Sequence, residues 1–363
     1  MHKAAGDEQR GGREALDRVV AAWAQLGRVF ALLAEDAPWP GHACGLNTAE
    51  YDALRSAFAR AHQQNGWFTP EEVRHAAGGI AHLLERTALD RWLAGYPALL
   101  QPRSPRTVGL ILAGNVPFVG LHDLLCVTLA GHRARVKVSG QDAGLTRATS
   151  DALITLCPEL AAAVAFSEER LGPVDAVIAT GSTNTARYFD HYFGHLPRIV
   201  RKGRVSVAVL DGSETEAELD ALGEDVFRYF GLGCRNVSKV FAPADFDTDR
   251  LFKAFYRWRD IAHHAKYANN LDYHRALWLL DREPFLENGF LLLRETAALA
   301  SPVAVLHLER YVDRSALDGR LRDLADQVQC VVGHGAVPFG QAQRPGPADH
   351  ADGVDTMAFL LAL

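Results

Sequence analysis

Apolar residues recur at helical spacing through the first 100 residues of the chain. One run comprises Leu16, Val19, Val20, Trp23, Leu26 and Val29, and a second comprises Val73, Ile80, Leu83, Leu84, Leu89, Trp92 and Leu93. Residues three and four positions apart share one face of a helix, so we expect residues 1–100 to be helical. Proline and glycine at 38–41 interrupt this region, and prolines at 102 and 105 end it.

From residue 107 onward, short apolar runs alternate with helical patterns. The predicted strands are 107–112, 133–138, 162–166 and 174–179, and the predicted helices are 117–130, 145–156 and 183–193. Strands that are apolar on both faces and separated by helices are typical of a parallel sheet covered by helices. Such sheets often bind nucleotides at the carboxyl ends of their strands, so a nucleotide site is expected there.

A second alternating block begins near residue 205. Its predicted strands are 205–210, 237–241, 290–293, 303–308 and 329–332, with helices at 214–230, 247–258 and 267–280. The tail from residue 337 is rich in glycine, proline and glutamine. The pattern therefore predicts an α/β chain with three parts, namely 1–203, 204–336 and the tail 337–363.

Composition narrows the class of protein. The 363 residues carry a formal net charge of −6, and no long basic block is present, so we do not expect a nucleic-acid partner. No apolar run approaches the ~20 residues that span a bilayer. The first 20 residues also lack the hydrophobic core of a signal peptide. We therefore predict no membrane span and a cytoplasmic location.

The five cysteines are odd in number and include no C-x-x-C pair, which argues against a disulfide framework or a structural zinc site. Cys234 lies in the segment GLGCRN, where glycines permit close approach and Arg235 favours the thiolate. The alternative for Cys234 is an inert core thiol. The other cysteines fit that alternative better, and these are Cys44, Cys126, Cys157 and Cys330. His263 and His264 lack further ligands at useful spacing, so no metal is expected.

Three further segments are candidates for binding or chemistry. No G-x-G-x-x-G or Walker A motif occurs, and the best phosphate cradle is ATGSTNT, with Thr180, Gly181 and Ser182 between a strand and a helix. The alternative is a simple helix N-cap. Asn115, in AGNVP, is either a turn residue or an amide that stabilises an oxyanion. Lys137 is either a solvent-facing strand residue or a cofactor contact.

The order and spacing of these segments resemble the aldehyde dehydrogenase superfamily. The resemblance is carried by AGNVP, RVKVSGQD, ATGSTNTAR, GLGCRNVSKVF and VPFGQAQ. The chain is most similar to the LuxC-type acyl-CoA reductases, also called fatty acid reductases, from about residue 65 to the C-terminus. Segments such as EDVFRYFGLGCRNVSK and HHAKYANNLDYH carry this closer similarity.

The resemblance implies an aldehyde-dehydrogenase-like α/β fold. It implies N-terminal helices and a Rossmann-type NAD(P)-binding domain in 1–203 and a catalytic cysteine domain in 204–336. The tail 337–363 would then return to the active site through Pro338–Gly340. Cys234 would be the nucleophile and Asn115 the oxyanion donor. The implied cofactor-binding residues are Lys137, Ser139, Thr180, Gly181 and Ser182.

Two departures from the superfamily pattern affect the expected reaction. The dehydrogenases carry a glutamate that activates water, whereas the corresponding stretch 198–203 has no carboxylate. Hydrolysis of an acyl-enzyme to the acid is therefore disfavoured. Gly140 occupies the place of a glutamate that holds the ribose 2′-hydroxyl in NAD-preferring members. Its absence tolerates a 2′-phosphate, so the expected cofactor is NADPH, with NADH as the alternative. The oligomerisation hairpin of the superfamily is reduced or missing.

The expected function is NAD(P)H-dependent reduction of an acyl thioester to an aldehyde through a Cys234 acyl-enzyme. The substrate would be an acyl-CoA or an acyl-carrier protein, and a biosynthetic partner enzyme is plausible. One alternative is an NAD(P)-dependent aldehyde dehydrogenase that produces the acid, and another is a non-catalytic pathway partner. One local basic run is interpreted either as a contact for an acidic partner or as a solvated loop. Its members are Arg198, Arg201, Lys202 and Arg204.

Overall fold

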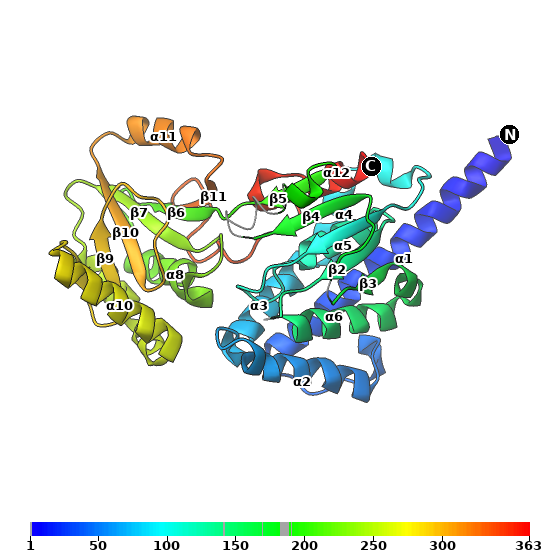
Figure 1. Cartoon of the computed structure of the whole chain (residues 1–363), viewed down its shortest axis with the longest axis horizontal. Coiled ribbons are helices and arrows are strands. Elements are labelled where there is room, and N and C mark those ends of the chain that lie inside the picture. Colours follow the sequence, from blue (N-terminus) through cyan, green and yellow to red (C-terminus); the bar gives the residue numbers. More distant parts are fainter. Residues whose placement is uncertain (1, 141, 169, 182–188, 190) are drawn as a thin grey trace. The chain divides into compact units, whose positions relative to one another are not determined.

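The computed structural model describes residues 2–140, 142–168, 170–181, 189 and 191–363, with side chains of 2–10 and 143 left undescribed. The chain divides into two compact units (Figure 1). Unit 1 comprises Met1–Lys202 and Arg344–Leu363, and unit 2 comprises Gly203–Gln343. Among the described residues, no helix combines the length and the apolar character that a bilayer crossing requires.

Unit 1 is built on a five-stranded parallel sheet in the order β3-β2-β1-β4-β5. The strands are β1 (Thr107–Ile111), β2 (Arg133–Lys137), β3 (Val164–Phe166), β4 (Ala176–Thr180) and β5 (Arg198–Arg201). Val108 and Leu110 in β1 and Val177 and Ile178 in β4 are almost completely buried, as both faces of a covered parallel sheet require. The strand order reverses its direction between β1 and β4.

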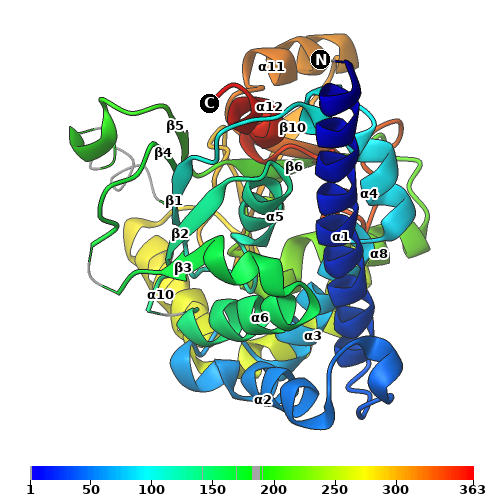
Figure 2. The same ribbon diagram turned by 90° about the vertical axis from the view of Figure 1, so that its right-hand side faces the viewer.

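Helices pack against this sheet and against one another. The helices that precede it are α1 (His2–Ala34), α2 (Thr48–Gln64), α3 (Pro70–Leu83) and α4 (Arg86–Leu93), and the later ones are α5 (Leu121–Leu129), α6 (Ala143–Leu156) and α12 (Thr356–Leu361). Helix α5 packs on β1 and β2, and α1 contacts α3, α5 and α6 (Figure 2). The indole of Trp23 in α1 is fully buried and donates to Thr128 Oγ1 of α5 at 2.9 Å. The predicted N-terminal helical region is therefore confirmed.

Unit 2 contains a six-stranded sheet in the order β11-β6-β7-β10-β9-β8. The strands are β6 (Val205–Val209), β7 (Val237–Pro243), β8 (Leu286–Glu287), β9 (Leu292–Glu295), β10 (Val305–Tyr311) and β11 (Val328–Val332). The β8–β9 pair is antiparallel, and the other pairs are parallel. The helices are α8 (Glu216–Phe227), α9 (Asp249–Phe255), α10 (Ala265–Asp281) and α11 (Arg314–Asp323), with 3-10 turns at Arg228–Gly231 and Tyr256–His263.

Alternation along β6 divides the core of unit 2 into two layers. Ala208 belongs to the apolar cluster that includes Phe227 of α8 and Phe255 of α9. Val207 points to the other face and packs with Leu317 of α11. Successive side chains of a strand point to opposite faces, so one strand serves both helical layers. Figure 1 shows α11 on the opposite side of this sheet from α8 and α10.

Several elements differ from the sequence-based expectations. The helix predicted at 117–130 begins at Leu121, because Phe118 adopts a positive φ of 61° that no continuing helix allows. Strand β5, helix α11 and helix α12 were not predicted. Helix α11 buries Leu317 as its single described core side chain, so its apolar periodicity is weak. Most of the helix predicted at 183–193 lies outside the described residues.

The C-terminal segment of unit 1 returns to its first half. Asp355 caps α12 and accepts a hydrogen bond from the Tyr96 hydroxyl at 2.9 Å. The ring of His132 hydrogen-bonds the carbonyl of Leu360 at 2.9 Å. Residues 337–343 belong to unit 2, so the predicted tail 337–363 spans both units.

Candidate functional site

The candidate cofactor residues gather at one edge of the unit 1 sheet. Lys137 ends β2, Thr180 ends β4, and Asn115 lies four residues after β1. Because β2, β1 and β4 are adjacent parallel strands, their carboxyl ends meet at the same edge. This edge includes the point between β1 and β4 where the strand order reverses, which is where nucleotides bind in open α/β sheets.

The turn that carries Asn115 is held by a residue that sequence reasoning missed. The side chain of Asn65, only 2% exposed, donates through Nδ2 to the buried carbonyl of Gly114 at 2.9 Å. Its Oδ1 accepts from the backbone N–H of Trp67 at 3.1 Å. Asn115 itself is exposed. The two hydrogen bonds of Asn65 therefore fix the backbone just before Asn115, whose side chain is exposed.

The structure describes two residues, Thr180 and Gly181, of the predicted diphosphate-binding segment. Thr180 and Gly181 are half-buried, and the N–H of Gly181 bonds the carbonyl of Arg201 on β5 at 3.4 Å. Ser182 lies outside the described residues, as do the residues that would begin the following helix. The strand end therefore has the expected position, and the interpretation of Ser182 stays a prediction.

The turn after β2 bears on the choice of cofactor. Ser139 is half-buried and its carbonyl accepts from the N–H of Asp142 at 3.0 Å. Gly140 is exposed, and a Cβ atom added to it would meet nothing within 4 Å. Asp142 is 3% exposed and accepts from the Thr146 hydroxyl at 3.2 Å, and its burial raises its pKa to about 7. A carboxyl group thus follows β2, but it is buried.

Cys234 is the exposed member of the five cysteines, all of which lie in the described part of the chain. Cys44, Cys126 and Cys157 are buried, and Cys330 is intermediate. Burial raises the pKa of Cys126 and of Cys157, which keeps these thiols protonated. An exposed thiol can meet a substrate, so Cys234 remains the candidate nucleophile.

Asn236 holds the loop that carries Cys234, and sequence reasoning also missed this role. Its Oδ1 accepts from the N–H of Gly233 at 2.8 Å, and its Nδ2 donates to the carbonyl of Arg228 at 2.8 Å. Nδ2 also contacts the carbonyl of Asp225 at 3.1 Å. Asn236 is only 2% exposed. One buried amide therefore links the cysteine loop to the end of α8.

The backbone around the loop is also constrained. Tyr229 and Phe230 have positive φ values of 52° and 57°, and Gly231 has 76°. Two consecutive non-glycine residues in this region are uncommon, and they turn the chain sharply away from α8. On the other side, the buried hydroxyl of Ser206 donates to the carbonyl of Cys234 at 3.0 Å. The position of the cysteine backbone is thus determined from both sides.

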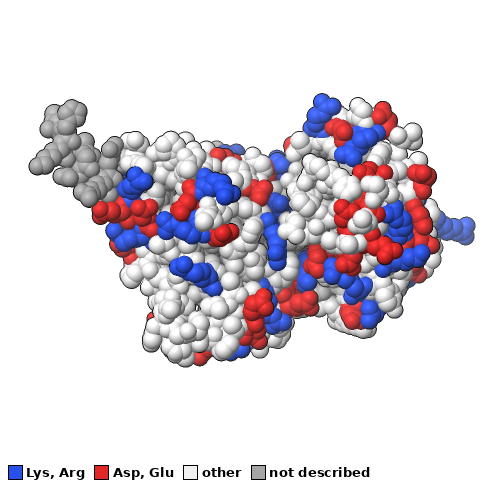
Figure 3. All heavy atoms as spheres, turned by 180° about the vertical axis from the view of Figure 1, so that it is seen from behind, with Lys and Arg blue, Asp and Glu red and all other residues white. Residues whose placement is uncertain are grey.

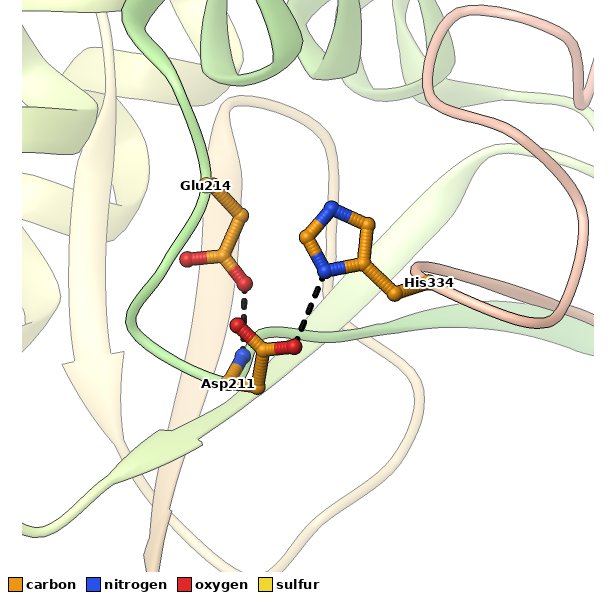
Figure 4. A group of neighbouring side chains, drawn as sticks. All are labelled: Asp211, Glu214 and His334. Atoms are coloured by element: carbon orange, nitrogen blue, oxygen red, sulfur yellow. Dashed lines mark hydrogen bonds and ion pairs between the residues drawn. The ribbon is translucent and has the colours of Figure 1, made fainter.

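A histidine and three carboxylates form a cluster near the end of β6. His334 Nδ1 lies 2.9 Å from Asp211 and Nε2 lies 2.9 Å from Glu218. Figure 4 shows His334 and Glu214 on either side of Asp211. Glu214 accepts from the N–H groups of Asp211 and Gly212 at 2.5 and 3.1 Å.

Asp211, Glu214 and His334 place ligand atoms within 4.8 Å of one another, and each of the three also forms hydrogen bonds within the protein. Two ring nitrogens can both donate only as an imidazolium. The carboxylates raise the pKa of His334 to about 9. We interpret the cluster as a structural group of ion pairs around the His334 imidazolium.

The structure corrects one member of the proposed basic run, Arg201, whereas Arg198 and Lys202 are exposed and their interpretation stays a prediction. Arg198–Arg201 is strand β5, and the Arg201 side chain is only 6% exposed. Arg201 donates to Asp123 at 2.6 Å, to Thr356 at 2.8 Å and to the carbonyl of Ala351 at 2.6 Å. A buried, fully bonded guanidinium is neither part of a solvated loop nor available to an acidic partner. On the face shown in Figure 3, basic and acidic side chains are interspersed.

The surroundings of His122, His263 and His264 bear on whether one of them could serve as a proton donor. Burial lowers the pKa of His122, whose ring lies 3.8 Å from the Cys126 sulfur and bonds the carbonyl of Pro347 at 3.1 Å. His264 caps α10 and stacks on Phe230 with ring centroids 4.3 Å apart. His263 is exposed at 83% of its side chain. None of these contacts identifies a general acid.

Comparison with solved structures shows the fold. Aldehyde dehydrogenase 21 from Physcomitrella patens, in complex with succinate, aligns over 98% of this chain and 88% of its own, at 10% identity and a TM-score of 0.62. An indole-3-acetaldehyde dehydrogenase from P. syringae, in complex with NAD+, covers 91% and 76%, at 13% identity and 0.58. An NADP-dependent enzyme from E. coli covers 90% and 76%, at 15% identity and 0.57. No protein-family model and no curated protein matches the sequence. The predicted aldehyde-dehydrogenase-like α/β fold is therefore confirmed.

Proposed function

We propose that this protein is an NAD(P)H-dependent oxidoreductase of the aldehyde dehydrogenase type that reduces an acyl thioester to an aldehyde. The observation that carries the proposal is Cys234, an exposed thiol on a loop fixed by Asn236 and Ser206. The fold supports the oxidoreductase class. The similarity of the sequence to LuxC-type acyl-CoA reductases supports the thioester substrate.

The absence of a carboxylate in 198–203 distinguishes reduction from oxidation to the acid. A hydrolytic dehydrogenase needs a base to activate water against its acyl-enzyme. In this chain the same stretch supplies strand β5, and its Arg201 is committed to Asp123. An acyl-enzyme here would be resolved by hydride or by a thiol rather than by activated water.

The residues at the edge of the unit 1 sheet fit a dinucleotide. Lys137 and Ser139 would hold the adenosine ribose side, and Thr180 and Gly181 would hold the diphosphate. Ser182 is proposed for the diphosphate on the resemblance alone. The bound nicotinamide would supply a hydride. NADPH is the proposed cofactor because Gly140 places no acidic group where a 2′-phosphate would lie, and the carboxyl of Asp142 is buried.

The proposed reaction conserves atoms and electrons. The Cys234 thiolate attacks the thioester carbonyl, and the C–S bond to the leaving thiol breaks, which gives an acyl-enzyme. The N–H of Cys234 and the Asn115 amide are the proposed oxyanion donors. Hydride addition to the acyl carbon gives a hemithioacetal oxyanion, which collapses to aldehyde and free thiolate. The departing thiolate takes one proton, so each turnover oxidises one NADPH and releases one aldehyde and one thiol.

The test measures NADPH consumption with acyl-CoA and with acyl-carrier protein, together with aldehyde trapping and intact mass. The wild type should form an adduct of acyl mass and produce aldehyde, and Cys234→Ala should do neither. Cys44→Ala is the control, because Cys44 is a buried thiol of unit 1, and this variant should retain the adduct. Asn115→Ala should slow acylation about 100- to 1,000-fold, the usual loss for one oxyanion donor. Oxidation of an added aldehyde to the acid by NAD(P)+ without added thiol would instead establish an aldehyde dehydrogenase, and failure to bind any nicotinamide cofactor would favour a non-catalytic protein.

A further inference from the structure

One face of helix α8 holds the segment that follows β11. Glu218, Ala221 and Asp225 are three and seven residues apart, so they lie on the same side of the helix. Glu218 binds His334 at 2.9 Å. A Cβ on Gly340 would lie 3.1 Å from the Ala221 Cβ, so the backbone approaches the helix closely. The segment 334–342 is therefore bound at successive turns along α8.

Asp225 makes the last of these contacts and is completely buried. Its Oδ2 accepts from the N–H of Gly340 at 2.6 Å, and its Oδ1 accepts from the N–H of Ala342 at 2.8 Å. Each carboxylate oxygen of Asp225 thus accepts a hydrogen bond from a different residue of this segment, Gly340 or Ala342. Gly340 adopts a φ of 78°, which lets the two N–H groups converge on a single side chain.

The same segment is joined to the cysteine loop. Arg235, the residue after Cys234, donates through Nε to the carbonyl of Ala342. Asn236, the next residue, donates to the backbone carbonyl of Asp225 itself. Asp225 therefore contacts the segment 340–342 through its side chain and the cysteine loop through its main chain. Arg235 adds a direct contact between the cysteine loop and Ala342.

We propose that Asp225 is a positioning residue that fixes Cys234 by clamping residues 340–342 against the cysteine loop. The proposal rests on the proposed function for its effect on turnover, although the clamp itself can be observed without substrate. Asp225 acts through the backbone of the loop and does not touch the reacting atoms. If the clamp is released, Arg235 loses a fixed partner, and the loop can move.

Asp225→Asn is the sharpest variant because it keeps the size of the side chain. An amide offers one acceptor oxygen and presents an NH2 group to the second backbone N–H, so one of the two contacts must fail. Asp225→Ala removes both contacts. The matched control is Asp220→Asn, which changes a carboxylate on the same helix that is 43% exposed and pairs with Arg257 at 2.9 Å. Circular dichroism and thermal melting identify variants that remain folded.

Three measurements on folded protein test the clamp. The first is amide hydrogen exchange at Gly340 and Ala342, which should be slow in the wild type and in Asp220→Asn and should accelerate in Asp225→Asn. The second is the rate of Cys234 alkylation by iodoacetamide, which should change in Asp225→Asn and not in the control. The third is steady-state kinetics, where kcat should fall roughly 10- to 100-fold with KM for the cofactor unchanged, since a displacement of about 1 Å can cost 100-fold.

The outcomes separate the two proposals. Faster exchange with altered alkylation supports the clamp even if no thioester is ever reduced, and in that case only the proposed reaction fails. Unchanged alkylation in a folded Asp225→Asn protein whose Gly340 and Ala342 amides exchange faster overturns the positioning role, because the segment has then been released without moving the thiol. Unchanged exchange overturns the clamp itself. If Asp225→Ala does not fold, Asp225→Asn still decides the question.

Discussion

The side-chain amide of Asn65 donates to the carbonyl of Gly114 across 49 positions of sequence and joins the end of α2 to the turn that carries Asn115. Both groups are buried. A buried carbonyl that loses its donor carries a desolvation penalty, so this contact stabilises unit 1 and orients the turn.

Replacing Asn65 with alanine should therefore destabilise the protein by about 1–3 kcal/mol, the cost of leaving a buried polar group unpaired. Urea denaturation measures the change. Gln63→Ala is the matched control because Gln63 lies on the exposed side of the same helix end, and its loss should change stability by no more than about 0.5 kcal/mol. Equal effects for the two variants would show that the contact with Gly114 does not contribute.

Asn236→Ala should loosen the cysteine loop. It removes one acceptor for Gly233 and the donor to the carbonyls of Arg228 and Asp225, so we expect about 1–3 kcal/mol of destabilisation and an altered rate of Cys234 alkylation. Asn270, whose Nδ2 bonds the Lys266 carbonyl at 2.8 Å within α10, provides the control variant Asn270→Ala. An Asn236→Ala protein with wild-type alkylation kinetics would contradict this role.

The ion-paired cluster around His334 predicts a dependence of stability on pH. Asp211 and Glu218 raise the pKa of His334 to about 9 from an ordinary value of 6.5. The imidazolium therefore contributes its full stabilisation below pH 6.5, and the contribution is lost as the pH rises through 9. Tm measured from pH 6 to 10 should fall more steeply for the wild type than for His334→Gln. His263→Gln, at an exposed histidine, should follow the wild type, and parallel curves for all three proteins would refute the assignment.

Gly140→Glu should shift the cofactor preference toward NADH. The position is exposed, a Cβ atom there would meet nothing within 4 Å, and no positive φ is required. A carboxylate near a bound 2′-phosphate would repel it, so the ratio of kcat/KM for NADPH to that for NADH should fall by about tenfold or more, equivalent to about 1.4 kcal/mol. Gly140→Gln matches the size without the charge and should leave the ratio near that of the wild type. A wild-type preference for NADH would contradict the starting assumption.

Burial of Asp142 predicts a second titration, in unit 1. Its carboxyl has a pKa of about 7 instead of 3.8, so the charged form is disfavoured in the folded protein. Stability from this group is highest below pH 3.8 and declines as the pH rises through 7. Asp142→Asn should therefore gain stability relative to the wild type at pH 8 and lose most of that gain near pH 4. Denaturant unfolding at the two pH values measures the difference, and an equal difference at both would exclude this origin.

Local sequence patterns predicted the α/β class, the main strands of both sheets and Cys234 as the candidate nucleophile among five cysteines. These follow from local patterns, because buried strands read as apolar runs and a glycine-flanked cysteine differs visibly from one inside an apolar helix. Only the three-dimensional structure shows which side chains fix the turn before Asn115 and the cysteine loop. Asn65, Asn236 and Asp225 bind backbone groups 49, 8 to 11 and 115 to 117 positions away, and no local pattern identifies such partners. Nor does a local pattern show that Arg201 of strand β5 is buried, since its carboxylate partner Asp123 lies 78 positions earlier in helix α5.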